Sequence, residues 1–117
     1  MTNPSRGEVW LINLDPTVGR EQAGRRPALV VSGDKLNHGP AELLIIAPLT
    51  TKDKGIVTHI RVEPESGGVR EPSFVMTEAF RSVSKQRLIK LLGTVDSKVL
   101  AEVEYSISAV LGLMNVG

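Results

Sequence analysis

The chain has 117 residues, of which 41% are hydrophobic and 23% charged; these values are ordinary for a folded domain and exclude global disorder. This length predicts one domain, residues 1–117, with a single modest core. Cysteine is absent, which excludes a disulfide framework, a thiolate nucleophile and a cysteine zinc site. The net charge is only +1, so any anion site must be a local cluster of basic residues rather than a general basic surface.

The N-terminal sequence MTNPSRGEVW is polar and lacks the apolar core of a signal peptide. No apolar run approaches the ~20 residues that span a bilayer. Together with the lack of cysteine, these features predict a cytoplasmic protein.

The first half of the chain is expected to contain three strands. Residues 7–15 alternate imperfectly between apolar and polar side chains and end at an Asp-Pro turn, which predicts the first strand. Residues 16–24 carry turn formers without periodicity and predict a long loop, which in so small a domain is usually functional. Residues 26–32, RPALVVS, contain the apolar run 27–31 and predict the second strand, and a turn-rich connection follows at residues 33–42. Residues 43–50 are continuously apolar, which indicates a central strand covered on both faces.

The second half is expected to contain three more strands. Residues 56–64 alternate as in a half-exposed strand and lead to a turn that contains two adjacent glycines. Residues 73–83 predict a fifth strand and residues 88–95 a sixth, with a short helical turn at SKQRL between them.

The hydrophobic period changes to that of a helix after Asp96, which is itself a favourable N-cap. The apolar residues at helical spacing are Leu100, Val103, Ile107, Val110, Leu111 and Met114. The expected fold class is therefore α+β and mainly β, a small twisted sheet or barrel with a C-terminal amphipathic helix.

Basic residues crowd the segment that leads into the second predicted strand. Arg20, Arg25 and Arg26 lie there with Glu21 among them. A guanidinium is charged at every working pH, and its planar fork matches a phosphate. The same residues also fit a solvated loop that keeps a strand edge soluble. The composition of the loop leaves both interpretations open.

Two threonines, Thr50 and Thr51, lie at the end of the predicted central strand. A hydroxyl at a strand end can donate to a phosphoryl oxygen, although threonine is also an ordinary turn former. If the second and third strands pair, Thr50 and Arg26 lie side by side, and an oxyanion between them meets a hydroxyl and a guanidinium together. The two histidines, His38 and His59, are far apart in the sequence, and the chain has no metal-ligand spacing.

Several motifs resemble those of the MazF/PemK toxin family, the mRNA interferases of bacterial type II toxin–antitoxin pairs. The N-terminal motifs are RGEVW, DPTVG, EQAG and RPALVVS, and the resemblance continues through IIAPLTTK, SFVMTEAFRSVSKQRLIKLLGTV and LAEVEYSISAVLGL. It implies an SH3-like or CcdB-like barrel of five to seven strands, with a C-terminal helix, that forms a homodimer. It also implies ribosome-independent cleavage of single-stranded RNA at short sequences, with no metal ion or other cofactor. The substrate 2′-OH would attack the adjacent phosphorus, leaving a 2′,3′-cyclic phosphate and a 5′-OH.

The resemblance implies three catalytic residues. The arginine before the strand proline is Arg26, the threonine after IIAPL is Thr50, and the glutamate of EQAG is Glu21. Arg26 is expected to stabilise the phosphorane, Thr50 to hydrogen-bond the phosphoryl oxygen, and Glu21 to orient Arg26 or approach the attacking hydroxyl. The general base stays open, because the pKa of an arginine lies above ~12. Further RNA contacts are expected from Arg20, Arg25, Ser32, Thr51 and Arg81.

One stretch departs from the family pattern. Many relatives carry a glutamine in a D/E-Q-[VI]-R stretch of the fifth strand, whereas here TEAFRS places Ala79 and Phe80 before Arg81. If that glutamine reads a base, the cut-site preference of this protein differs from theirs.

The resemblance also implies a protein partner, a cognate MazE-like antitoxin whose acidic, disordered tail folds along the toxin and covers its RNA groove. Two other functions fit the same fold: a CcdB-like toxin that binds DNA gyrase without chemistry, and a degenerate member that only sequesters an antitoxin. The presence of Glu21, Arg26 and Thr50 together favours the ribonuclease.

Overall fold

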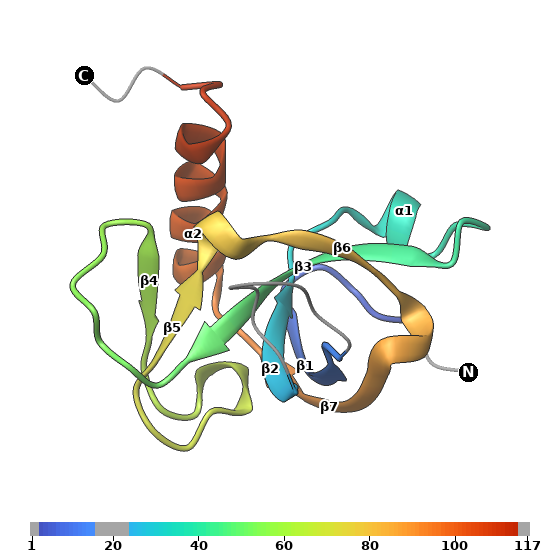
Figure 1. The fold of residues 1–117 in the computed structure, drawn as a ribbon, viewed down its shortest axis with the longest axis horizontal. Coiled ribbons are helices and arrows are strands. Elements are labelled where there is room, and N and C mark those ends of the chain that lie inside the picture. The colour runs from blue at the N-terminus through green and yellow to red at the C-terminus, as the bar shows by residue number, and fades with distance from the viewer. Residues whose placement is uncertain (1–2, 16–23, 115–117) are drawn as a thin grey trace.

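The computed structural model describes residues 3–15 and 24–114 (Figure 1). The strands are β1 (Glu8–Asn13), β2 (Arg25–Val30), β3 (Leu43–Thr50), β4 (His59–Val62), β5 (Ser73–Met76), β6 (Arg81–Ser84) and β7 (Leu88–Thr94). The helices are α1 (Asp34–Asn37) and α2 (Ser97–Val110), and short 3₁₀ turns are η1 (Ser66–Gly68), η2 (Thr77–Ala79) and η3 (Lys85–Arg87). The predicted class, mainly β with a C-terminal helix, is confirmed.

The strands form one antiparallel sheet in the order β4-β5-β3-β2-β1-β7, with β6 pairing to β3 outside this path. The long strand β3 organises the sheet. Its first half pairs with β6 and its last two residues pair with β5, while β2 lies along its other side. Within the described residues β4 and β7 do not pair, so the closed barrel that the resemblance implies stays a prediction.

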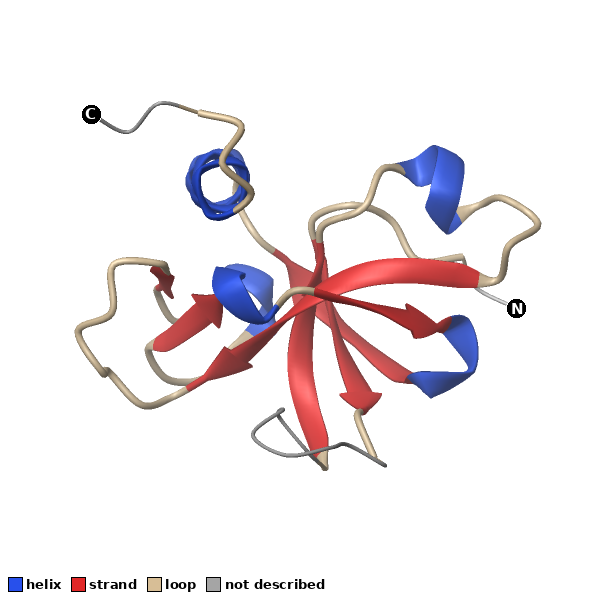
Figure 2. Cartoon of the chain, turned by 45° about the horizontal axis from the view of Figure 1, so that its top comes forward, coloured by secondary structure: helices blue, strands red, loops and turns tan. Residues whose placement is uncertain are grey.

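Apolar side chains fill the space on both faces of the sheet. Leu29, Ala47 and Leu49 pack on one face against Val99 and Val103 of α2. On the other face a second core gathers Trp10, Ile12, Leu14, Ala28, Val30, Leu44, Ile46 and Val83. Figure 2 views α2 end-on, on one side of the sheet. Because β3 contributes to both cores, its sequence is continuously apolar, as the sequence analysis expected.

The predicted fifth strand over residues 73–83 is wrong as a single element, because the chain forms β5, then η2, then β6. The break occurs at Thr77, which is fully buried. Its hydroxyl bonds the carbonyl oxygen of Thr58 and the hydroxyl of Ser106, at 2.6 Å each. These bonds hold the chain in a turn, and β6 then pairs with the opposite half of β3 from β5.

Other boundaries also differ from the predictions. The expected strand at residues 56–64 begins only at His59, and the turn-rich connection at residues 33–42 contains the one-turn helix α1. The start of α2 is confirmed, since Oδ1 of Asp96 accepts the amide of Val99 at 2.9 Å, as an N-cap should.

Candidate active site

The pairing of β2 with β3 brings Arg26 and Thr50 together. Ala28 lies opposite Pro48, and Leu29 lies opposite Ala47. Continuing this antiparallel register toward the start of β2 places Arg26 opposite Thr50. Both side chains are half-buried. The strand pairing on which their juxtaposition depended is therefore confirmed.

A cavity of about 400 Å³ opens where these two residues meet. Its lining residues are Gly24, Arg25, Arg26, Pro27, Leu49, Thr50, Thr51, Lys52 and Ser73. Arg25, Arg26 and Lys52 supply positive charge, and among the described residues no carboxylate lines the cavity. Such a lining favours an anion of several oxygens, which guanidinium forks and hydroxyls bind together.

The hydroxyl of Thr50 is set up as a donor. Its Oγ1 accepts the backbone amide of Lys52 at 3.2 Å. A threonine hydroxyl that accepts one hydrogen bond still carries its own proton to donate. An oxyanion in the cavity can therefore receive that proton in a hydrogen bond.

A paired backbone holds the two arginines. In β1, Ile12 lies opposite Arg26 and Asn13 lies opposite Arg25. The strand is thus hydrogen-bonded to β1 on one side and β3 on the other. Because the backbone of Arg25 and Arg26 is paired with β1, each side chain starts from a defined position.

Gly24, which directly precedes β2, is anchored as well. The amide of Leu14 donates to the carbonyl oxygen of Gly24 at 2.9 Å, and the amide of Gly24 donates to Oδ1 of Asp15 at 2.8 Å. The Arg87 guanidinium adds a bond to the carbonyl oxygen of Asn13 at 3.0 Å. Two predicted site residues, Arg20 and Glu21, lie outside the described residues.

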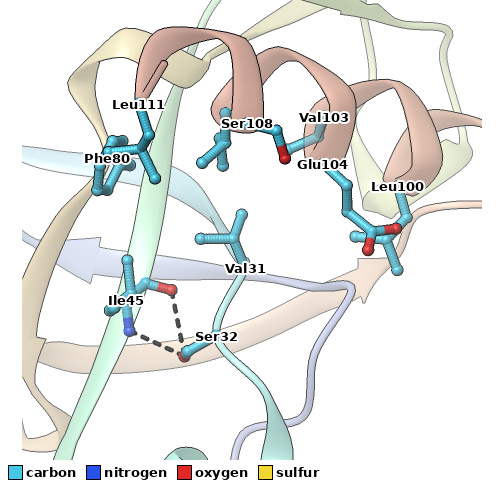
Figure 3. Close-up of a pocket in the computed structure, with 10 residues that line it drawn as sticks. Val31, Ser32, Ile45, Phe80, Leu100, Val103, Glu104, Ser108 and Leu111 are labelled. Atoms are coloured by element: carbon cyan, nitrogen blue, oxygen red, sulfur yellow. Dashed lines mark hydrogen bonds between the residues drawn. The ribbon is translucent and has the colours of Figure 1, made fainter. Parts of the chain in front are cut away.

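Ser32 is not brought to this cavity. It is only 8% exposed, and its hydroxyl bonds the side chain of Asn37 and accepts the amide of Ile45 at 2.9 Å. Figure 3 shows it on the wall of a different cavity, of about 300 Å³, beneath α2. Arg81 lies opposite Ile46 in β6, shares the sheet face of Arg26 and Thr50, and does not line their cavity.

Two polar residues that line the cavity, Lys52 and Ser73, were not among the site residues predicted from the sequence. Lys52 follows the threonines directly, so its position next to Thr50 was already a local signal. Ser73 reaches the cavity because β5 pairs with the end of β3, where Phe74 lies opposite Thr50. That pairing joins segments far apart in the chain, and no local pattern indicates it.

In the described part of the chain, no group of three or more His, Cys, Asp or Glu residues is placed to hold a metal ion. No helix among the described residues is long and apolar enough to cross a membrane.

Comparison with known proteins shows the family. Residues 5–111 match the family described as PemK-like, MazF-like toxin of type II toxin–antitoxin system. Endoribonuclease EndoA of Bacillus subtilis is 28% identical over 111 residues, covering 94% of this chain and 96% of that protein. Endoribonuclease MazF of Staphylococcus saprophyticus is 30% identical over 112 residues, covering 95% of this chain and 93% of that protein.

Solved structures agree with this relationship. The crystal structure of MazF from Deinococcus radiodurans superposes with a TM-score of 0.86 at 31% identity, covering 96% of this chain and 99% of that one. A MazE–MazF crystal structure from the same organism superposes with a TM-score of 0.79 at 31% identity, covering 97% of this chain and 100% of that one. The resemblance seen in the motifs is thereby confirmed, and the chain belongs to the family of PemK-like, MazF-like toxins of type II toxin–antitoxin systems.

Proposed function

We propose that this protein is a metal-independent endoribonuclease that cleaves single-stranded RNA in the cavity between β2 and β3. The observation that carries the proposal is the shared lining of that cavity by Arg26 and Thr50, with further positive charge and no carboxylate among the described residues. The relatives named endoribonuclease support the same reaction class.

The reaction is a transesterification within the RNA. The 2′-OH attacks the adjacent phosphorus, the bond from phosphorus to the 5′-oxygen breaks, and a 2′,3′-cyclic phosphate and a 5′-OH remain. The guanidinium of Arg26 stabilises the charge that develops on the phosphoryl oxygens, and the hydroxyl of Thr50 donates to one of them. Because DNA has no 2′-OH, it binds without being cut.

The remaining cavity residues position the substrate. Arg25, Thr51 and Lys52 bind phosphates on either side of the reacting one. Glu21, which lies outside the described residues, is proposed to orient Arg26 or to take the proton of the 2′-OH. The leaving 5′-oxygen takes up a proton from solvent or from a group in the cavity.

The proposed partners are a second copy of the chain and a MazE-like antitoxin with an acidic, disordered tail. The MazE–MazF structure from Deinococcus radiodurans supports the antitoxin. A disordered acidic segment suits a cationic cavity, because its carboxylates take the places of RNA phosphates as it folds onto the surface.

The test is cleavage of a long RNA by the protein and its variants, followed by primer extension, which reports activity and the cut-site sequence together. Arg26→Ala and Thr50→Val are expected to lower the rate at least about 100-fold, the usual loss when one donor to a reacting oxyanion is removed. Thr50→Ser keeps the hydroxyl and is expected to retain most of the activity.

The control is Lys98→Ala on α2, which removes a cation from the helix that packs on the opposite face of the sheet. Circular dichroism and thermal unfolding establish that each variant is folded. Retained cleavage by both Arg26→Ala and Thr50→Val would show that the site is assigned wrongly. A folded wild type that cuts no RNA and instead binds gyrase would favour the CcdB-like alternative.

A further inference from the structure

Thr50 belongs to a row of side chains that crosses three strands of the sheet. Phe74 of β5 lies opposite Thr50 of β3, and Arg61 of β4 lies opposite Phe74. Side chains at directly opposed positions point to the same face of an antiparallel sheet. The row therefore leads from the candidate active site to the edge strand β4.

The neighbouring row confirms which face this is. Val75 lies opposite Leu49 and Ile60 lies opposite Val75. All three of these side chains pack in the core that includes α2. Because successive residues of a strand point to opposite faces, Thr50, Phe74 and Arg61 face away from α2, on the side of the cavity that holds Arg26.

The guanidinium of Arg61 is held in place on this face. Its Cζ lies 5.8 Å from the centroid of the Phe74 ring, within the range of a cation–π contact. Its Nε donates to Oε1 of Glu63, and the two terminal amino groups of the fork take no part in that bond. Phe74 is 7% exposed, whereas the side chain of Arg61 is 51% exposed. The ring thus serves as a support, and the cation is the group that solvent reaches.

We propose that Arg61 binds an RNA phosphate outside the scissile one, so that the bound strand crosses the sheet from β2 over β3 and β5 toward β4. This inference rests on the proposed ribonuclease function. Neighbouring strands lie about 4.8 Å apart, so the backbone of Arg61 is on the order of 10 Å from that of Thr50. A phosphate beyond the reacting nucleotide falls within reach of a side chain as long as arginine.

Two carboxylates compete with that phosphate. Glu63 shares a hydrogen bond with Arg61, and the charge of Asp53 also acts on the guanidinium. In the free protein Glu63 keeps the fork oriented, and a phosphate then engages the terminal amino groups. Removal of the Glu63 charge is therefore expected to strengthen RNA binding, which is the opposite of what loss of a structural ion pair would do.

The experiment measures affinity for an RNA oligonucleotide that carries a 2′-deoxy nucleotide at the scissile position, over a series of salt concentrations. Arg61→Gln is expected to weaken binding about fivefold at low salt, as loss of one exposed charge contact does. The slope of log K against log salt should fall in magnitude by about 0.7, the value for one phosphate of a single strand. Lys98→Gln removes the same charge from α2 and is expected to change neither quantity, while Glu63→Gln tightens binding.

A second arm locates the contact. Oligonucleotides are shortened one nucleotide at a time from each end, or carry one neutral methylphosphonate. At one particular phosphate, the methylphosphonate should weaken RNA binding by the wild type by about the same factor as Arg61→Gln does. It should not weaken RNA binding by the Arg61→Gln variant any further. In steady-state cleavage, Arg61→Gln should raise KM far more than it lowers kcat.

The outcomes separate the two proposals. If the wild type does not cleave RNA, the proposed function fails. If it does cleave, and Arg61→Gln matches Lys98→Gln in affinity and salt slope, the inference about Arg61 is wrong and the function stands. Weaker binding by Glu63→Gln would likewise overturn the inference, since Arg61 would then act only through its pairing with Glu63.

Discussion

Thr50 and Ser32 carry the same functional group near the ends of adjacent strands, and their surroundings give them different uses. The hydroxyl of Ser32 bonds Asn37 and accepts the amide of Ile45, so it ties the chain after β2 to α1 and β3. The hydroxyl of Thr50 accepts one amide, from Lys52, and faces a cavity lined by arginines. At this scale a residue's chemistry depends on which neighbours engage its polar atoms.

Glu78 gives a residue-scale prediction about pH. Burial acts to raise the pKa of its carboxyl, but hydrogen bonds from Thr58, from its own backbone amide and from His59 outweigh burial and hold the pKa below the usual value of 4.5. The Thr58 hydroxyl donates at 2.6 Å, and Nε2 of His59 lies 3.0 Å from Oε2. Because the folded pKa is lowered, this stabilisation is complete above the unfolded pKa and is lost as pH falls through the folded one.

The measurement compares the urea midpoint of the wild type with that of Glu78→Gln between about pH 6 and about pH 3. The wild type should have the higher urea midpoint at the upper end of this pH range, and the difference between the two midpoints should narrow as the pH falls. Glu102→Gln, on the exposed side of α2, serves as the control. A difference in urea midpoint that stays constant across this pH range would contradict a lowered pKa of Glu78 in the folded protein.

At the scale of elements, the turn η1 packs its backbone directly onto β7. A Cβ atom on Gly68 would lie 2.1 Å from the carbonyl oxygen of Leu92, and one on Gly93 would lie 2.6 Å from the amide nitrogen of Gly68. Gly68 also has φ +74°, a conformation that glycine adopts most readily. Gly68 and Gly93 therefore permit the close contact between η1 and β7, and Gly68 also permits the turn.

The element-scale prediction is that Gly93→Ala lowers the free energy of unfolding by about 2 kcal/mol, because the backbones of η1 and β7 must separate. Gly33→Ala is a matched control, since a Cβ there meets nothing within 4 Å, and it should change stability by less than about 1 kcal/mol. Urea denaturation measures both. Equal stability of the two variants would show that η1 moves away without cost.

Over the whole molecule, the sheet separates two environments. One face carries α2 and its core, and the other carries a second core beside the cavity of Arg26 and Thr50. The helix therefore packs on the face opposite the cavity, and in the proposed mechanism RNA reaches the strands without displacing it. In the proposed mechanism, catalysis by Arg26 and Thr50 on this surface needs only the substrate's own 2′-OH as nucleophile.

The whole-molecule prediction is that RNA cleavage continues at an undiminished rate in excess EDTA. In the proposed mechanism Arg26 and Thr50 supply the charge stabilisation that a metal ion supplies in other nucleases. A substrate with 2′-deoxy at the scissile nucleotide should bind and stay intact. Denaturing gels measure both effects. Loss of cleavage in EDTA, with recovery on addition of Mg²⁺, would contradict the metal-independent mechanism.

The sequence by itself determined the features that depend on neighbouring residues. These are the bounds of β3, the N-cap of α2 at Asp96, the mainly β class, the family motifs and the identity of Arg26 and Thr50 as candidates. Periodicity and capping operate within a few residues, so a single segment displays them.

Only the tertiary structure decided the features that depend on contacts between distant segments. The division of residues 73–83 into β5 and β6 follows from the hydrogen bonds of Thr77 with Thr58 and Ser106. Strand pairing also decides that Ser73 lines the cavity and that Arg61 lies over Phe74. Strand pairing and register are set by side-chain packing across the whole sheet. The free energy of that packing depends on several strands together, so no single stretch of sequence reveals it.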